Sequence, residues 1–418
     1  MDTIIRTDVC IIGGGPGGSA AALQLAKRGV RAVLVEKAVF PRDKVCGDAL
    51  SGKVMRTLER IDPLLAKAVT ADARGLPSWG VTFIAPSGRA LRVPFSRNTG
   101  VGEAPGVIMP RLDLDALLFD KVKATEGIDV LEGTSARSYE RTEDGWSIKL
   151  DGRTKATLKC QLVLAADGAN SYFARHVAKL GMDPKHHAAG VRAYYSGVKD
   201  LDPTGFIELI FLKDLLPGYL WVFPLPGGRA NVGLGLRSDV VKKRGVDLKA
   251  LMTKLLAEHP QLRERFRDAR PDSAIQGMGL PLASKRRPLS GDGYMLIGDA
   301  GHLIDPFTGE GISHAMISGV HAADVAAETL GTGVEAAQLK QYDARVWKRL
   351  GKELSISTRL QQLADRAWLF DLVVDRANKN PALADTISCM FTDLDLRERL
   401  KKPGFYMDLL LGRAPSKA

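Results

Sequence analysis

Residues 8–36 read DVCIIGGGPGGSAAALQLAKRGVRAVLVE, and this stretch decides the fold of the chain. The apolar residues 9–12 lead straight into a run of glycines, residues 19–28 are rich in Ala and Leu, and residues 30–35 are apolar again. Such a pattern predicts a buried strand, a tight turn, a helix and a second strand. The chain is therefore expected to open with a βαβ unit.

The turn carries the spacing G-x-G-x-x-G at Gly13, Gly15 and Gly18. A helix that begins inside such a turn offers unpaired N–H groups and its positive dipole end to a pyrophosphate, and glycines permit close approach. Glu36 ends the second strand, where its carboxylate can accept hydrogen bonds from the 2′- and 3′-hydroxyls of a ribose. The stretch thus predicts a dinucleotide site that favours an adenosine without a 2′-phosphate.

The composition is that of an ordinary globular protein with more than one domain. The chain has 418 residues, of which 45% are hydrophobic and 26% charged, and this excludes disordered and fibrous classes. Its formal charge of +11 fits either an anionic partner or a basic solvated exterior. Because no nucleic-acid motif accompanies the charge, no nucleic-acid partner is predicted, and peripheral membrane contact stays open.

The cysteines and the absence of targeting signals indicate a cytoplasmic setting. The cysteines stand at positions 10, 46, 160 and 389 without C-x-x-C spacing, which argues against a disulfide framework and a zinc site. His302, His314 and His321 fit no common metal cluster, so no metal is predicted. The early first strand leaves no room for a signal peptide, and no apolar run reaches the roughly 18 residues that span a bilayer. A position at the inner face of the cell membrane is left open.

Two later strands end in Asp and Gly. The apolar residues 162–166 stop at Asp167-Gly168, and residues 293–297 lead to Gly298-Asp299 before a helix over about 311–330. Each pair alone fits an ordinary turn, since Asp-Gly is a common turn dipeptide. Their order and spacing behind the first glycine turn favour a shared role.

Strand-rich segments interrupt this first unit. Residues 79–84 and 90–95 predict a hairpin around Pro86-Ser87-Gly88, and residues 172–279 alternate strands and turns around a helix at 248–258. Residues 130–159 are interpreted as a β-meander of short strands, the last at 157–159. The chain from about residue 335 is expected to be mostly helical.

The three glycine-bearing strand ends together resemble the flavoprotein monooxygenase and reductase superfamily with the p-hydroxybenzoate hydroxylase fold. The resemblance implies FAD, with Glu36 at the adenosine ribose and Asp167 near the pyrophosphate. Asp299 would hold the ribityl hydroxyls, and Arg111 opens a helix near the cofactor. A bound FAD has two phosphates, a ribose and a polyol chain, and each needs its own hydrogen-bonding partners.

The loop after Asp299 reads HLIDPFTGEGISHAM and precedes a helix, whose N–H groups could face the N1–C2=O edge of the flavin. The complete set of expected FAD-binding residues is Gly13, Gly15, Pro16, Gly17, Gly18, Glu36, Lys37, Arg42, Cys46, Gly47, Arg111, Asp167, Gly168, Asp299, Pro306, Gly309, Gly311 and Ile312.

Two further stretches, FPRDKVCGD at 40–48 and PGYLWVFP at 217–224, are similar to the F-P-R-x-K-x-C-G and Y-x-W-x-F-P motifs of the geranylgeranyl reductase family. The resemblance covers nearly the whole chain and implies saturation of isoprenoid C=C bonds by reduced FAD. One departure is Asp48, which stands where some archaeal members have a second glycine.

The candidate catalytic residues are Cys46, Tyr219 and Trp221. Alternating aromatic residues in a strand often only fill a core, but here Tyr219, Trp221 and Phe223 share one face that could line an apolar tunnel. Cys46 is either a small buried hydrophobic residue or, beside the flavin, a proton source.

The leading prediction is an FAD-dependent prenyl reductase acting on an isoprenoid lipid, quinone or diphosphate. NADPH or NADH, or an electron-donor protein, would reduce the flavin. The alternatives are a flavin-dependent monooxygenase or halogenase, which share the FAD frame, and a flavin-bound membrane-surface or partner-binding protein without turnover.

The predicted fold is mixed α/β: a Rossmann-like FAD-binding domain of the p-hydroxybenzoate hydroxylase type with an inserted antiparallel β-sheet substrate domain and a helical C-terminal region. The expected boundaries are 1–75, 106–171 and 280–330 for the FAD-binding domain, 76–105 and 172–279 for the substrate-binding domain, and 331–418 for the helical region.

Overall fold

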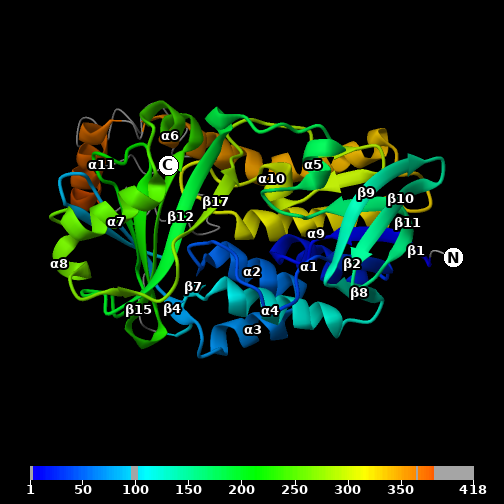
Figure 1. The fold of residues 1–418 in the computed structure, drawn as a ribbon, viewed down its shortest axis with the longest axis horizontal. Coiled ribbons are helices and arrows are strands. Elements are labelled where there is room, and N and C mark those ends of the chain that lie inside the picture. Colours follow the sequence, from blue (N-terminus) through cyan, green and yellow to red (C-terminus); the bar gives the residue numbers. More distant parts are fainter. Residues whose placement is uncertain (1–2, 96–101, 364–365, 381–418) are drawn as a thin grey trace.

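The computed structural model describes residues 3–95, 102–363 and 366–380. In this described part of the chain the strands form two sheets of eight strands and one of three. The two large sheets occupy opposite halves of the long axis of the molecule (Figure 1).

The first large sheet is built around β1 (Ile4–Ile12), which lies between β2 (Ala32–Glu36) and β11 (Ala156–Ala165), and all three are parallel. The register pairs Ile12 with both Val35 and Ala165. The loops that follow the three strands therefore leave the sheet at the same edge. The order continues with β8 (Ile128–Glu132) beyond β2, and with β19 (Tyr294–Leu296) and β18 (Ser290–Gly291) beyond β11.

The expected β-meander is wrong in two respects. Residues 157–159 and 162–165 belong to one strand, because β11 pairs with β1 at every position from Thr157 to Ala165 except Gln161. β8 pairs in parallel with β2, whereas only β9 (Thr134–Thr142) and β10 (Gly145–Gly152) continue antiparallel from β11. The polar Lys159 and Gln161, which face outward in an otherwise buried strand, produced the false break.

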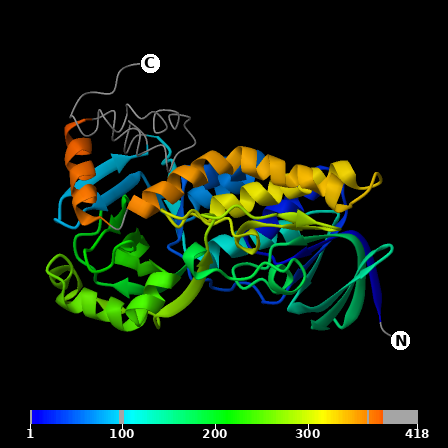
Figure 2. The same ribbon diagram turned by 90° about the horizontal axis from the view of Figure 1, so that it is seen from above.

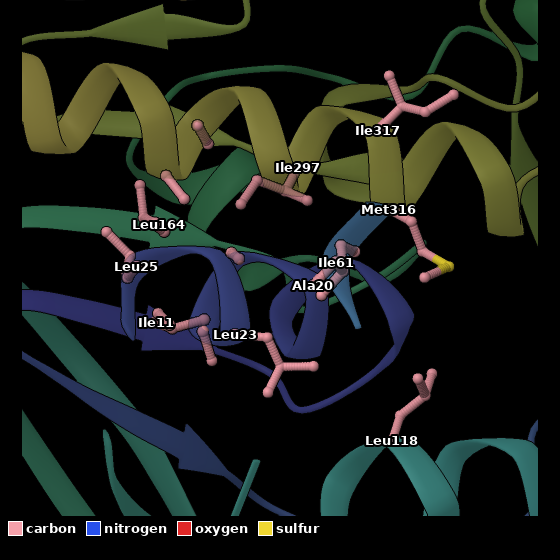
Figure 3. Close-up of a cluster of buried hydrophobic side chains, with 14 of the residues drawn as sticks. Ile11, Ala20, Leu23, Leu25, Ile61, Leu118, Leu164, Ile297, Met316 and Ile317 are labelled. Carbon is pink, nitrogen blue, oxygen red and sulfur yellow. The ribbon is translucent and has the colours of Figure 1, made fainter. Parts of the chain in front are cut away.

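Two helices pack against each other on the first sheet. α1 (Pro16–Lys27) and α9 (Ile312–Thr329) run side by side, and apolar side chains from both meet those of β1 and β11 (Figure 3). Small residues permit this approach: Ala20 to Ala22 of α1 are buried, and Gly319 of α9 lies against the carbonyl oxygen of Gly17. The N-terminus of α1 is thereby held directly behind the glycine turn.

The second large sheet is antiparallel except where β13 (Ile207–Ile210) runs parallel to β5 (Gly80–Ile84). The predicted hairpin is present as β5 paired with β6 (Ala90–Pro94). Along the sheet the other strands are β14 (Tyr219–Leu225), β15 (Arg229–Arg237), β12 (His187–Ser196), β16 (Arg270–Pro271) and β17 (Gln276–Pro281). The apolar faces of β14 and β15 pack on α7 (Leu248–Glu258), at the position expected for a helix.

Short elements connect the two large sheets. The small sheet consists of β3 (Ala49–Leu50), β7 (Gly106–Ile108) and β4 (Leu76–Ser78). The remaining helices are α2 (Gly52–Ile61), α3 (Pro63–Ala71), α4 (Arg111–Lys123), α5 (Tyr172–His176), α6 (Ser238–Arg244) and α8 (Arg263–Phe266), with short 3-10 helices η1 (Pro184–His186), η2 (Pro226–Gly228) and η3 (Gly298–Gly301).

The C-terminal part is helical as far as it is described. α10 (Ala336–Leu363) follows α9 along the molecule, and α11 (Ala367–Lys379) lies against the β5–β6 hairpin (Figure 2). Phe370 of α11 stacks on Phe211, with ring centroids 4.1 Å apart. Cys389 and the rest of residues 381–418 lie outside the described residues. No helix within the described ranges is long and apolar enough to cross a membrane.

We expect Gly319→Ala to destabilise the protein by about 1–3 kcal/mol, because the new methyl group would overlap the carbonyl oxygen of Gly17 in a close-packed helix pair. Gly351→Ala in α10 is the matched control, since its nearest neighbour atom, in Trp347, would be 3.8 Å from the new Cβ. It should stabilise the helix by up to about 1 kcal/mol. Thermal unfolding followed by circular dichroism measures both, and equal midpoints would contradict the packing argument.

Candidate functional site

A cavity of about 630 Å³ lies where the two large sheets face each other. Its walls include the loops at the edge of the first sheet, residues 42–51, strands β13 and β14, and residues 308–312. The residues predicted from sequence that line it are Gly13, Gly15, Pro16, Gly17, Glu36, Lys37, Arg42, Cys46, Gly47, Arg111, Asp167, Gly168, Tyr219, Trp221, Asp299, Gly309, Gly311 and Ile312.

Two predicted residues, Gly18 and Pro306, are absent from the cavity wall. A Cβ on Gly18 would collide with the carbonyl oxygen of Gly13, so this glycine allows the helix to sit close to the strand. The carbonyl of Pro306 accepts a hydrogen bond from Gln361 Nε2 (2.6 Å), which ties the loop to α10. Both positions shape the wall from behind it.

The glycine turn leaves an open anion-binding end on α1. Gly15 is the N-cap and provides no side chain to occupy the first N–H groups. Gly13 has φ of 101°, and a Cβ there would lie 2.5 Å from the carbonyl oxygen of Ala166. The positive end of the helix dipole therefore faces the cavity without a capping group, as a diphosphate requires.

Glu36 is held rigidly at the end of β2. Its Oε2 accepts a hydrogen bond from Gly14 N and its Oε1 accepts one from Ala38 N, both at 2.7 Å. Since each carboxylate oxygen can accept a second hydrogen bond, Glu36 retains capacity for two hydroxyl groups in the cavity. This arrangement fits a ribose.

Asp167 supplies an acceptor that is not used within the described part of the chain. Its Oδ2 accepts from Tyr172 N (2.9 Å) and Phe173 N (3.4 Å), whereas its Oδ1 is buried without a partner there. Burial raises the pKa of Asp167 above its ordinary value. An unsatisfied buried oxygen in a cavity wall favours a bound group that donates a hydrogen bond, and the donor set at this edge therefore fits FAD.

Asp299 and Lys44 join the two sides of the cavity. Lys44 Nζ lies 2.9 Å from Asp299 Oδ2, so the 42–48 loop is tied to η3. Nearby, α9 begins after Gly311, which also provides no side-chain cap. Tyr219 Oη donates to the carbonyl of Thr308 at 2.5 Å and holds the preceding loop against β14.

A buried ionic cluster anchors the same loop to α4. Arg111 donates from Nε and Nη2 to the two oxygens of Asp115, and Arg42 donates to Asp115 from Nη1, each at 2.6 Å. Burial by itself would raise the pKa of Asp115, but the two guanidinium groups outweigh it and hold that pKa below its ordinary value. Arg111 is thus a structural anchor as well as a wall residue.

The wall also has an apolar arm. Tyr219, Trp221 and Phe223 of β14 all contribute to it, while Leu220 and Val222 point into the core behind and are fully buried. The Trp221 ring covers Gly233, where a Cβ would overlap the indole. The further apolar members of the arm are Leu50, Phe95, Ile207 and Leu209.

Sequence reasoning missed a polar network under the Cys46 loop. Asn231 Nδ2 donates to the carbonyl of Cys46 and to Asp48 Oδ2, both at 2.7 Å, and Asn231 Oδ1 accepts from Trp221 Nε1 at 2.9 Å. Tyr194 Oη donates to Asp48 Oδ2 at 2.8 Å. Asn231 and Tyr194 stand in strands β15 and β12 far along the chain, and no local pattern distinguishes them.

Known proteins resemble this chain over most of its length. A family profile described as FAD binding domain matches residues 6–203. A digeranylgeranylglycerophospholipid reductase of Methanoculleus marisnigri is 30% identical over 349 residues, which cover 82% of this chain and 81% of that protein. A menaquinone reductase of Mycolicibacterium smegmatis is 28% identical over 372 residues, covering 86% of this chain and 84% of that protein.

Solved structures share the fold. A geranylgeranyl bacteriochlorophyll reductase-like protein from Thermoplasma acidophilum superposes with a TM-score of 0.81 at 24% identity, over 95% of this chain and 99% of that chain. A flavin-dependent brominase superposes with a TM-score of 0.75 at 22% identity, over 92% of this chain and 93% of that chain. At these identities the likeness establishes the fold alone.

The fold and the site together define a flavin-dependent oxidoreductase with the p-hydroxybenzoate hydroxylase-like fold. Within that class, the chain belongs to the geranylgeranyl reductase family. The predicted family and the predicted mixed α/β fold, with an antiparallel second sheet and C-terminal helices, are confirmed.

We expect Asp115→Asn to cost about 3–5 kcal/mol in stability, because it removes the charge that compensates the buried guanidinium of Arg111. Asp120→Asn on the same helix is the control: its pair with Lys123 is exposed and should contribute less than about 1 kcal/mol. Denaturant unfolding measures both variants. A small effect at Asp115, comparable to that at Asp120, would show that the cluster does not anchor the loop.

Proposed function

We propose that the protein is an FAD-dependent reductase that saturates C=C bonds of a geranylgeranyl or other polyprenyl group on a lipid, quinone or diphosphate. The main support for this proposal is the apolar, aromatic side of the cavity formed by β13 and β14. It is continuous with the side of the same cavity that fits a dinucleotide. A hydrocarbon chain offers no polar group for recognition along its length, so burial against such a surface must provide its binding energy. The names of the family's digeranylgeranylglycerophospholipid and menaquinone reductases support this substrate class.

In this proposal the edge of the first sheet binds FAD. The α1 N-terminus would take the pyrophosphate, Glu36 the adenosine ribose, Asp167 a hydroxyl donor, and Asp299 the ribityl chain. When bound and reduced, FAD supplies a hydride to an alkene carbon. NADPH, NADH or an electron-donor protein would provide the electrons.

The side chains of this protein orient the alkene and provide the proton. An isolated alkene has no carbonyl to polarise, so alignment and a nearby acid must lower the barrier. Tyr219 and Trp221 would hold the chain. Burial raises the pKa of the Cys46 thiol, so the group keeps its proton at neutral pH and can serve as the acid.

The domain division belongs to the same proposal. Residues 1–75, 106–171 and 280–330 would form the FAD-binding domain, and residues 76–105 and 172–279 would bind the substrate. The cavity lies between segments of these two groups. The basic charge of +11 supports contact with an anionic membrane surface, from which a lipid substrate would be taken.

Anaerobic mixing of the reduced enzyme with a geranylgeranyl lipid tests the proposal. We expect flavin reoxidation and a product about two mass units heavier for each reduced double bond, one hydride and one proton being added. Absence of both with lipid, quinone and diphosphate substrates would refute the reductase assignment.

Trp221→Ala should lower kcat/KM by on the order of 10- to 100-fold, because losing one buried aromatic contact with an apolar substrate costs roughly 1.5–3 kcal/mol. Trp368→Ala is the control, since Trp368 is 61% exposed on α11, away from the cavity wall. Equal effects of the two substitutions would argue against an apolar substrate arm along β14.

The second candidate is a flavin-dependent monooxygenase or halogenase. A flavin-dependent brominase has the same fold, so the fold by itself does not separate this function from a reductase. Substrate-triggered oxygen consumption by the reduced enzyme distinguishes the two functions: a reductase works without oxygen, whereas a monooxygenase or halogenase requires it.

A further inference from the structure

Asp48 is a buried carboxylic acid in the loop that lines the cavity. Its side chain has no exposed surface, and its φ of 71° lies in the left-handed region that glycine favours. Three donors hold its carboxyl group: Tyr194 Oη and Asn231 Nδ2 bond to Oδ2, and the backbone N of Arg111 bonds to Oδ1 at 3.3 Å. A left-handed backbone at a non-glycine residue and three hydrogen-bond donors to its carboxyl group indicate a site built for this side chain.

Burial and nearby cations act on the pKa of Asp48 in opposite directions. Arg111 of α4 and Arg192 of β12 favour its ionised form, and Arg192 is shared with Asp43, to which it donates at 2.9 Å. Burial outweighs these cations and the two donors, and it raises the pKa of Asp48 to about 6. The carboxyl group therefore changes charge close to neutral pH, unlike an exposed aspartate.

Asp48 is coupled to Cys46, two residues earlier in the same loop. The Asp48 N–H donates to Cys46 Sγ at 3.4 Å. Burial raises the pKa of the thiol, Arg111 opposes this increase, and negative charge on Asp48 adds to it. Negative charge on Asp48 therefore favours the protonated form of the Cys46 thiol.

Tyr194, which donates a hydrogen bond to Asp48, is itself partly exposed. The tyrosine is half-buried, and the guanidinium groups of Arg192 and Arg229 lie 4.2 and 5.5 Å from its ring centroid. Arg229 is exposed and pairs with Asp272 at 3.1 Å. A hydrogen bond therefore joins the carboxyl group of Asp48 to a partly exposed phenol that does not line the cavity.

We propose that Asp48 restores the proton of Cys46 after each reduction and is itself refilled from the surface through Tyr194. The S–H bond of Cys46 breaks as a C–H bond forms on the alkene carbon next to the one that receives hydride from the reduced flavin. The O–H bond of Asp48 then breaks as the S–H bond re-forms. Tyr194 passes its hydroxyl proton to the carboxylate and takes one from water. This inference rests on the proposed reductase function.

The first test is the alkylation of Cys46 by iodoacetamide in the oxidised FAD-bound enzyme, followed against pH by mass spectrometry of the Cys46 peptide. Asp48→Asn keeps the shape of the side chain but removes its negative charge, so the apparent pKa of the Cys46 thiol should fall by about one unit. Asp144→Asn, in an exposed turn, is the control and should leave the profile unchanged. An unchanged profile in Asp48→Asn would overturn the coupling without touching the reductase assignment.

The second test is turnover with a geranylgeranyl lipid. Asp48→Asn and Tyr194→Phe should each lower kcat by roughly 10- to 100-fold. Only protonated Asp48 can give a proton to Cys46, so wild-type kcat should fall as pH rises through about 6. The Asp48→Asn variant should lack this pH dependence. Tyr194→Phe retains the aromatic ring but lacks the hydroxyl group. If its kcat equalled that of the wild type, the proposed proton transfer through Tyr194 would be overturned. A wild-type enzyme that reduces no polyprenyl substrate would instead refute the proposed function, and the alkylation profile would still decide the coupling.

Discussion

The close approach of the glycine turn to the neighbouring strand ends is the constraint on which the rest of the structure depends. Gly13 N donates to the carbonyl of Val35 at 2.8 Å, and Ala166 N donates to the carbonyl of Ile12 at 2.8 Å. Any side chain at Gly13 would meet the backbone of Ala166. These contacts bring the open end of α1, the carboxylate of Glu36 and that of Asp167 to one edge of the first sheet.

A second constraint is the attachment of the 42–48 loop on both sides of the cavity. Arg42 joins it to α4 through Asp115, and Lys44 joins it to η3 through Asp299. From the second sheet, Asn231 holds the carbonyl of Cys46. The loop is therefore placed by both sheets at once, and its thiol stands between a cofactor-binding edge and an apolar arm. A proton source in this position matches the reaction that we propose, because the alkene would lie between the same two walls.

Much of the fold could be predicted from the sequence because its signals are local. The strand, glycine turn, helix and acid of residues 8–36 follow from spacing and propensity, and the β5–β6 hairpin follows from a turn between two alternating strands. The single long strand β11 was missed because its outward Lys159 and Gln161 interrupt the apolar run, and only pairing with β1 shows its length. The parallel pairing of β8 with β2 is likewise a long-range choice that local alternation cannot reveal.

The sequence by itself determined the dinucleotide turn, the family motifs and the aromatic face of β14, because residue type and short spacing are sufficient for each. Tertiary structure alone decided that Asp48 would be a buried acid, since its partners Tyr194 and Asn231 come from strands β12 and β15. Burial, which raises the pKa of that carboxyl group, depends on how two sheets close over one loop. The closure of the two sheets over this loop depends on contacts between residues more than a hundred positions apart, and no local sequence pattern predicts such contacts.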